Sequence, residues 1–462
     1  MAGDGGNTVS GSSGAYFRRW APGVVLAIAA LLASACTSGG APGTTEHTTL
    51  NVLMVNNPQM LDLQRLTADN FTARTGIRVN YTVLPENDLR ARAGQEFAGR
   101  AGHYDVATLS NYEVPFYAKS GWLAPLDDHV KADPGFDQAD ILKPWTTSLT
   151  GQDGKLYAEP FYGESSFLMY RKDVLAAKGI TMPERPTWTQ VAQIAAQADG
   201  AAPGMKGICL RGQPGWGEMI SPLTTVWNTF GGGWFDQTWN PLLTSPQTVQ
   251  ATQFYVDLVR AHGEPEATKA GFTECLNAML QGKTALWYDA TSAAGYLEGK
   301  DSPVAGKIGY VAAPVMRTRS SGWLYTWAWA VPKASANSDA AWKFISWASG
   351  KDYEKLVGGE LGWSKAPAGK RESTYLNANY LYASHAFAEQ TQDAIDAADP
   401  RNPGVQPRPT LGIQFVGIPE FAALGDQVSE GISAALAGQG DVGAALAKGQ
   451  QQAEQVAAKY RG

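Results

Sequence analysis

Two charged residues of this chain stand where an apolar strand is expected to end. Arg211 follows the apolar residues 208–210, and Asp289 follows the apolar residues 285–288. A guanidinium has five donors in a fixed plane, and a carboxylate accepts several hydrogen bonds, so the two types could hold adjacent hydroxyl groups. The alternative for Arg211 is a salt bridge that holds its loop. The alternative for Asp289 is to cap a helix that begins near Thr291.

Aromatic residues alternate along residues 323–329. Every second side chain of a strand lies on one face, which groups Trp323, Tyr325, Trp327 and Trp329. Such a stripe is more often core than ligand surface. We expect Trp329 in the core, and Trp323 and Trp327 in contact with a ligand.

Other candidates lie in expected loops. Tyr112 and Glu113 follow the third expected strand, and Glu164 lies beside a crossover between two parts of the chain. Either glutamate could instead cap a helix or pair with a surface cation. Trp216 follows a glycine in a loop and could form a lid. Asn57 follows the first strand, where the ordinary role of an asparagine is in a turn.

This combination of residue types fits a sugar or sugar alcohol. Such a molecule has hydroxyls that donate and accept hydrogen bonds on a carbon chain with weakly apolar C–H faces. Its site needs carboxylates, arginine or amides between aromatic planes. A secreted glycoside hydrolase is the competing class, because it also combines tryptophan platforms with two carboxylates, such as Glu113 and Asp289. The spacing of the acidic residues does not indicate such a pair.

Motifs for other chemistries do not occur in the chain. The five histidines stand singly, without an HExxH helix, and no Walker loop or GxGxxG is present. Residues 163–167 lack the final glycine of a nucleophile elbow. We therefore expect no catalytic residue, no metal and no cofactor. The net charge of −6, without a basic tract, gives no reason to expect nucleic acid as a partner.

Strands and helices alternate in the pattern from residue 50 onward. Strands are expected over residues 50–55, 77–83 and 105–109, and helices over residues 58–74 and 87–100. This succession predicts a parallel sheet, and ligands bind at the carboxyl ends of the strands in such sheets. The length of the chain exceeds what one hydrophobic core serves, which favours two lobes.

Residues 1–36 resemble the signal peptide of a bacterial lipoprotein. Two arginines precede an apolar run over residues 24–32, and three small residues lead to Cys36. The run is too short to span a bilayer as a helix. The resemblance implies lipidation of Cys36, although Ala33 stands where the family usually has leucine, and an ordinary signal peptide is the alternative. Residues 37–49, rich in Thr, Ser, Gly and Pro, are expected to form a flexible tether.

Cys209 and Cys275 are the two remaining cysteines. In an exported protein they could form a disulfide bond. The sequence does not give the distance between their Cα atoms, so it leaves this bond open.

Several stretches together resemble the extracellular solute-binding proteins of ABC importers, of the maltose-binding-protein type. They are residues 71–79, 121–126, 157–188, 281–287 and 340–345. The resemblance implies an α/β fold, the type II periplasmic-binding-protein fold of two lobes. Each lobe would be a mainly parallel sheet flanked by helices, with the ligand cleft between the lobes. The expected lobes are residues 50–160 with 316–362, and residues 164–312 with 366–462.

A narrower resemblance is to the sorbitol/mannitol-binding branch of that family. It is carried by residues 208–218, 287–291, 322–327 and 412–421. The chain departs from the branch at residues 325–326, where Tyr-Thr replaces Trp-Ala, and in the turn at residues 54–58. The ligand-binding candidates are Asn57, Tyr112, Glu113, Glu164, Arg211, Trp216, Asp289, Trp323, Trp327 and Gln414.

The resemblance implies a substrate-binding lipoprotein of a carbohydrate importer, which is not an enzyme. We expect a monomer, anchored through Cys36 to the outer face of the bacterial cytoplasmic membrane. It would capture a polyol or related sugar by hinge closure and deliver it to the membrane subunits. A surface lipoprotein without a role in transport is a further alternative. The variants Arg211→Ala and Asp289→Asn are each expected to bind ligand more than roughly tenfold more weakly. The melting temperature of the empty protein is expected to stay nearly unchanged.

Overall fold

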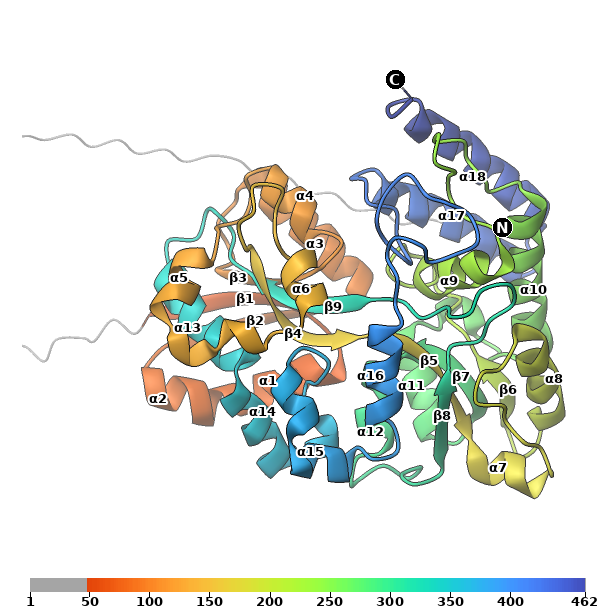
Figure 1. Ribbon diagram of the computed structural model, residues 1–462, viewed down its shortest axis with the longest axis horizontal. Helices are drawn as coiled ribbons and strands as arrows, with labels where there is room; N and C mark the ends of the chain where they lie inside the picture. Colours follow the sequence, from red (N-terminus) through yellow and green to blue (C-terminus); the bar gives the residue numbers. More distant parts are fainter. Residues whose placement is uncertain (1–47, 462) are drawn as a thin grey trace, which may run out of the picture. The chain divides into compact units, whose positions relative to one another are not determined.

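The chain contains two β-sheets in a computed structural model that describes residues 48–461. The expected signal peptide, Cys36 and most of the expected tether lie outside the described residues. The five-stranded sheet has the order β2-β1-β3-β9-β4, and the four-stranded sheet has the order β6-β7-β5-β8. Both sheets belong to the same compact unit (Figure 1).

The five-stranded sheet begins with the three strands that the sequence predicts. Its strands are β1 (Thr49–Val55), β2 (Arg78–Leu84), β3 (Val106–Ser110), β4 (Ala158–Glu164) and β9 (Tyr325–Ala330). β1 pairs in parallel with β2 and β3, whereas β9 is antiparallel to β3 and β4. The strand β1 begins at Thr49, so it takes in the last residue of the expected tether.

The four-stranded sheet follows the same plan. Its strands are β5 (Ser166–Arg171), β6 (Lys206–Cys209), β7 (Thr284–Ala290) and β8 (Ile308–Ala312). β6 and β7 are parallel, and β5 is antiparallel to β7 and β8. In each sheet all strands except one therefore run in the same direction, which agrees with the expected mainly parallel sheets. The reversed strands, β9 and β5, were not predicted from the sequence.

Local sequence determines both ends of the first predicted helix. Asn57 caps α1 (Pro58–Thr67) by accepting a hydrogen bond from Met60 N at 3.0 Å. The helix continues through a π-helical turn, Ala68–Thr72, into α2 (Ala73–Thr75). It ends at Gly76, whose φ of 71° is a left-handed conformation that glycine adopts without strain. The expected helix over residues 58–74 is thus confirmed.

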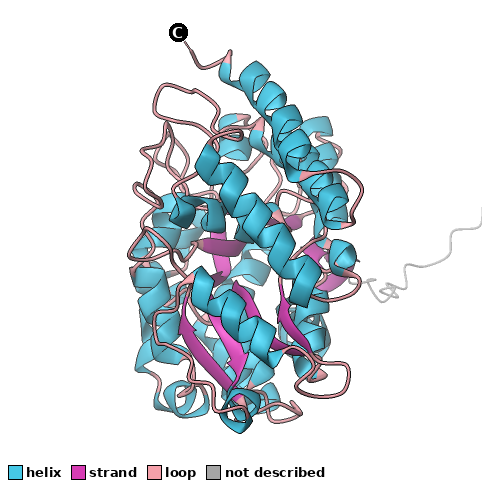
Figure 2. Cartoon of the chain, turned by 90° about the vertical axis from the view of Figure 1, so that its right-hand side faces the viewer, coloured by secondary structure: helices cyan, strands magenta, loops and turns pink. Residues whose placement is uncertain are grey.

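Further helices flank both sheets. Beside the five-stranded sheet are α3 (Glu86–Gly99), α4 (Val114–Lys119), α5 (Asp127–Ala132), α6 (Lys143–Ser148), α13 (Ser338–Ser349) and α14 (Lys351–Val357). The other helices are α7 (Lys172–Ala177), α8 (Trp188–Ala198), α9 (Ile220–Phe230), α10 (Pro246–His262), α11 (Phe272–Leu280), α12 (Ala294–Leu297), α15 (Ala378–Ala383), α16 (Ala388–Asp396), α17 (Phe421–Leu436) and α18 (Val442–Ala457). Figure 2 shows helices in front of the strands on the side of the four-stranded sheet.

The chain passes directly from one sheet to the other. β4 ends at Glu164 and β5 begins at Ser166, so Ser165 alone connects the two sheets at this point. Residues 313–324 lead back from β8 to β9. Within residues 48–461 no helix combines the length and the apolar character that a membrane span requires.

A disulfide bond joins Cys209 at the end of β6 to Cys275 in α11. Both cysteines are buried in a small apolar cluster with Phe167, Met169 and Trp287. The bond that the sequence left open is therefore formed in the structure. It ties the end of β6, an edge strand of the four-stranded sheet, to α11.

Candidate functional site

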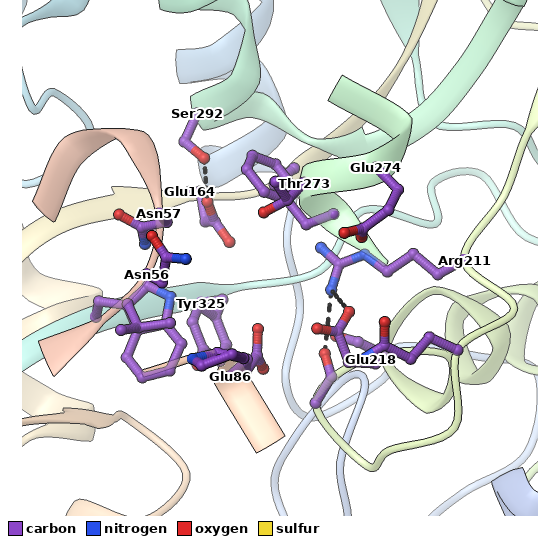
Figure 3. A pocket seen from close by; sticks show the side chains of 18 of the residues that line it. Asn56, Asn57, Glu86, Glu164, Arg211, Glu218, Thr273, Glu274, Ser292 and Tyr325 are labelled. Atoms are coloured by element: carbon purple, nitrogen blue, oxygen red, sulfur yellow. Dashed lines mark hydrogen bonds and ion pairs between the residues drawn. The ribbon is translucent and has the colours of Figure 1, made fainter. Parts of the chain in front are cut away.

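A cavity of about 170 Å³ lies at the ends of strands from both sheets (Figure 3). Its lining comes from the loops after β1, β2 and β6, from the ends of β4 and β7, from the start of α11, and from β9. The polar lining residues are Asn56, Asn57, Glu86, Tyr162, Glu164, Arg211, Gln213, Glu218, Ser221, Thr273, Glu274, Ser292 and Tyr325. Open α/β sheets bind ligands at this edge, because the polar loops after parallel strands meet there.

Arg211 lines the cavity and is held by Asp289. Its Nε donates to Asp289 Oδ2 at 2.9 Å, and its Nη2 donates to Oδ1 at 2.6 Å. Asp289 is fully buried and also accepts from Trp287 Nε1 and its neighbour Ala290 N. Asp289 is therefore behind the lining and positions the guanidinium. Both the salt-bridge role and the cavity position hold for Arg211, whereas the structure shows no contact by which Asp289 caps the turn at Thr291.

Two cavity glutamates have raised pKa values. Burial raises the pKa of Glu164 to about 8, against the opposing effects of a hydrogen bond from Ser292 and of the nearby Arg211 charge. Burial also raises the pKa of Glu218 to about 8, and Glu86 adds to this while Arg211 opposes it. At neutral pH each carboxyl group is therefore mostly protonated, and it can donate as well as accept a hydrogen bond.

A second arginine, Arg90 of α3, lies behind the cavity wall. Its Nη1 donates to Glu113 Oε2 at 3.0 Å, and its Nη2 donates to Glu86 Oε1 at 2.6 Å and to Tyr325 Oη at 2.7 Å. Its Cζ lies 3.8 Å from the ring centroid of Trp216. Glu113 is thus the partner of a buried cation, whereas the alternative role expected for it was to pair with a surface cation.

Five of the ten candidates line this cavity, and five do not. Asn57, Glu164, Arg211, Trp323 and Trp327 line it. Outside the lining are Tyr112, Glu113, Trp216, Asp289 and Gln414.

The candidates outside the lining hold loops in place. The hydroxyl of Tyr112 donates to the carbonyl of Ile418, and the side chain of Gln414 donates to the carbonyl of Leu324. Trp216 is 4 % exposed, with the Arg90 guanidinium over its ring, so in this structure it does not form a lid over the cavity.

The aromatic stripe divides between the cavity and the core. Trp323 and Trp327 line the cavity. Trp329 is fully buried, and its ring lies 5.3 Å from that of Phe161 and 5.5 Å from that of Phe344. Tyr325, between them on the same face, also lines the cavity and anchors Arg90 through its hydroxyl. Its position was part of the expected stripe, but its role as an anchor was not predicted.

Sequence reasoning missed three further glutamates of the lining. Glu86 opens the helix after the second strand, so its position at a strand end was a signal that could have found it. Glu218 lies within the stretch 208–218 that carried a resemblance. Glu274 is in the first turn of α11, remote in sequence from any strand end, and no local signal indicates it.

The disulfide bond connects two segments of the lining. Cys209 precedes Arg211 by two residues, and Cys275 directly follows Glu274. Figure 3 shows Glu218 and Glu274 on opposite sides of the Arg211 guanidinium. The bond therefore limits how far Arg211 and Glu274 can separate.

Among the described residues, no group of three or more His, Cys, Asp and Glu side chains is arranged to hold a metal ion.

The raised pKa values predict a pH dependence of stability. Glu164 and Glu218 bind protons more tightly in the folded state than in the unfolded chain. The free energy of unfolding should therefore fall as the pH rises from about 5 to 8, and level off above this interval. Denaturant unfolding at several pH values measures it.

The control is the double variant Glu164→Gln/Glu218→Gln. Burial also raises the pKa of Glu159, which lies away from the cavity, so Glu159 contributes to the pH dependence of both proteins. The test is therefore the difference between the free energies of unfolding of the wild type and the double variant. This difference in stability should change steadily between pH 5 and pH 8. Parallel curves for the two proteins would contradict the prediction.

Comparisons with known proteins agree with this geometry. The model of a family described as bacterial extracellular solute-binding protein matches residues 57–355. A mannitol-binding protein of Pseudomonas aeruginosa is 40 % identical over 405 residues, which cover 87 % of this chain and 92 % of that protein.

Solved structures match over nearly the same span. A solute-binding protein of an ABC transporter from Agrobacterium vitis S4, with bound D-mannitol, has 44 % identity and a TM-score of 0.86. The match covers 89 % of this chain and 99 % of that one. A protein from Agrobacterium radiobacter K84 in complex with ribitol has 24 % identity and a TM-score of 0.78, with 88 % and 98 % covered. The likeness to these structures confirms the expected fold class.

Proposed function

Because the chain belongs to the bacterial extracellular solute-binding proteins, we propose that it captures an acyclic sugar alcohol of the mannitol type for an ABC importer. The observation that carries this proposal is the cavity at the strand ends of both sheets. It combines carboxyl, amide and guanidinium groups with the rings of Trp323 and Trp327. The relatives named after mannitol or solved with it, at 40 % and 44 % identity, support the same ligand class.

The cavity chemistry suits an uncharged polyol. Glu164 and Asn57 lie on the side of the five-stranded sheet, and Arg211 lies at the end of β6 on the other side. Hydroxyl groups can donate to the carboxyl and amide oxygens and accept from the guanidinium. The C–H face of the ligand can pack on a tryptophan ring. A Kd near 1 μM needs about −8 kcal/mol, which such contacts in a closed cavity can supply.

Ligand capture by hinge closure is part of the proposal. The lobes are residues 50–160 with 316–362, and residues 164–312 with 366–462. Ser165, between β4 and β5, is one of the hinges. A ligand that contacts residues of both sheets gains binding energy only when the lobes are closed, so it shifts the population toward the closed form. The membrane subunits of the importer recognise that closed form.

A binding role, rather than catalysis, agrees with the placement of the carboxylates. The pair that a hydrolase could use, Glu113 and Asp289, does not line the cavity. Each of the two is instead paired with a buried arginine. The family and the similar structures are binding proteins of transporters, which points to a protein that returns its ligand unchanged.

A thermal-shift screen over hexitols, pentitols and the corresponding sugars tests the proposed function. A hexitol should raise the melting temperature most, because mass action stabilises the form that binds it. Mass spectrometry of the ligand after incubation should find it unaltered. The proposal fails if no polyol shifts the melting temperature, or if the ligand is hydrolysed or otherwise converted.

The chain takes an extracytoplasmic position, as its family does, and we propose a lipid anchor on Cys36. One acyl chain holds a protein to a membrane only marginally, so two or three chains are needed for durable anchoring. The protein would work as a monomer, tethered by the residues after Cys36 to the outer face of the cytoplasmic membrane.

Replacing Cys36 with serine should release the protein from the membrane. Full-length chains expressed in a bacterium that processes lipoproteins are separated into membrane and soluble fractions by ultracentrifugation. We expect the Cys36→Ser variant in the soluble fraction and the matched Ser38→Ala variant in the membrane fraction. A Cys36→Ser protein that still sediments with membranes would contradict the anchor.

A further inference from the structure

The cavity is rich in acidic groups. Four glutamates line it: Glu86, Glu164, Glu218 and Glu274. Among the lining residues that the structure describes, Arg211 is the one permanent cation. An anionic ligand would need a positive group that is free to receive it, so the state of each positive feature near the cavity decides whether anions can bind.

The donors of Arg211 are largely taken by the protein. Two of them bind the carboxylate of Asp289 at 2.9 and 2.6 Å. Nη1 binds the carbonyl of Gly217 at 3.1 Å and Oε2 of Glu218 at 3.3 Å. Two acidic groups thus surround one guanidinium. It can offer a remaining N–H to a hydroxyl, but it has no unbalanced charge for a second carboxylate.

The N-terminus of α11 is the second positive feature at the cavity. Phe272, Thr273 and Glu274 of its first turn line the cavity. A helix N-terminus carries a partial positive charge and can bind an anion. Here Glu274 occupies this end, since its Oε2 accepts from the N–H of Gly271 at 3.0 Å. The helix therefore already holds a carboxylate of its own chain.

The remaining two glutamates do not create a place for an anion. Glu86 is paired with Arg90, which also binds Glu113, so this cation is shared between two carboxylates. Glu164 accepts a hydrogen bond from the neutral Ser292. Burial raises its pKa and that of Glu218, and neighbouring acidic groups add to the rise.

We propose that this cavity selects its ligand by charge: it admits neutral and cationic polyhydroxylated molecules and rejects anionic ones. The inference rests on the proposed function and adds a determinant of specificity to it. An aldonate or a polyol phosphate would meet the Glu274 carboxylate without a free counter-ion, because the charges of Arg211 and Arg90 are already paired with acidic groups of the chain. An amino-alditol would place its ammonium group beside the same carboxylate, and the two charges would attract each other.

Isothermal titration with three ligands of similar length tests this selection at pH 7 and one ionic strength. The ligands are D-sorbitol, D-gluconate and 1-amino-1-deoxy-D-sorbitol. Gluconate should bind at least tenfold more weakly than sorbitol, and the amine no more than tenfold more weakly. The ratio of the gluconate Kd to the sorbitol Kd should fall at least threefold in Glu274→Gln. It should be unchanged in Glu372→Gln, which alters an exposed glutamate outside the cavity.

The outcomes separate this inference from the proposed function. Gluconate within tenfold of sorbitol overturns charge selection while the polyol function stands. The same holds for an amine more than tenfold weaker than sorbitol, and for a ratio that stays the same in Glu274→Gln. The absence of binding by sorbitol and mannitol alike overturns the proposed function, and the inference with it.

Discussion

Replacing Arg211 with alanine is expected to weaken polyol binding by more than tenfold and to destabilise the empty protein by about 3–5 kcal/mol. The loss of stability follows from the position of Asp289, which is fully buried and bound to Arg211 through both carboxylate oxygens. Without the guanidinium, a buried carboxylate keeps only the hydrogen bonds from Trp287 and Ala290. Urea unfolding and isothermal titration measure the two effects.

A double variant separates the effect of the unpaired Asp289 charge on stability from the effect of the lost Arg211 contact on ligand binding. Arg211→Met/Asp289→Leu removes both members of the pair, and such replacements often restore stability. We expect this variant to regain much of the lost stability but none of the affinity. An Arg211→Ala protein as stable as the wild type would contradict the buried-pair account. Burial of Asp289 thus replaces the sequence-based expectation of an unchanged melting temperature.

Replacing Trp323 with alanine is expected to weaken hexitol binding by about 100-fold. A tryptophan buries about 150–250 Å² at about 25 cal/mol per Å², of which roughly half would face the ligand. About 2–3 kcal/mol of binding energy depends on that face, which corresponds to the stated change in Kd. Isothermal titration with D-mannitol measures it.

Trp329 provides the matched control, because it belongs to the same stripe but is packed in the core. Trp323→Phe should weaken binding at least tenfold, whereas Trp329→Phe should reduce stability and leave the Kd of the folded protein within about twofold. Equal effects of the two exchanges on Kd would remove Trp323 from the ligand surface. The pair also controls for general loosening of the segment that includes β9.

The fold could be predicted where local pattern determines the element. Residues 50–55 and 58–74 have strand and helix periodicity, with Asn57 and Gly76 as end signals, and the structure follows them closely. The reversed direction of β5 and β9 could not be predicted in this way. Strand direction depends on how the chain returns to the sheet, and hydrophobic alternation is the same in both directions.

The part of the site that lies at strand ends could also be predicted from the sequence. Asn57, Glu164 and Arg211 follow or end strands, and such positions converge at one edge of an α/β sheet. Tyr112 and Glu113 follow a strand too, but Arg90 draws Glu113 away from the cavity wall. Ser110 also holds Glu113, since its N–H and its hydroxyl both donate to Oε2, at 2.9 and 2.8 Å. The contact with Arg90 arises from the packing of α3 and has no local signature.

A crystal structure of the protein grown with D-mannitol tests the central claim most directly. It should contain one intact mannitol molecule in the cavity, with hydroxyls within hydrogen-bonding distance of Glu164 and Arg211 and a C–H face against Trp323. The account would be contradicted by a complex in which the polyol binds elsewhere, for example beside Tyr112 and Trp216, while this cavity contains no polyol.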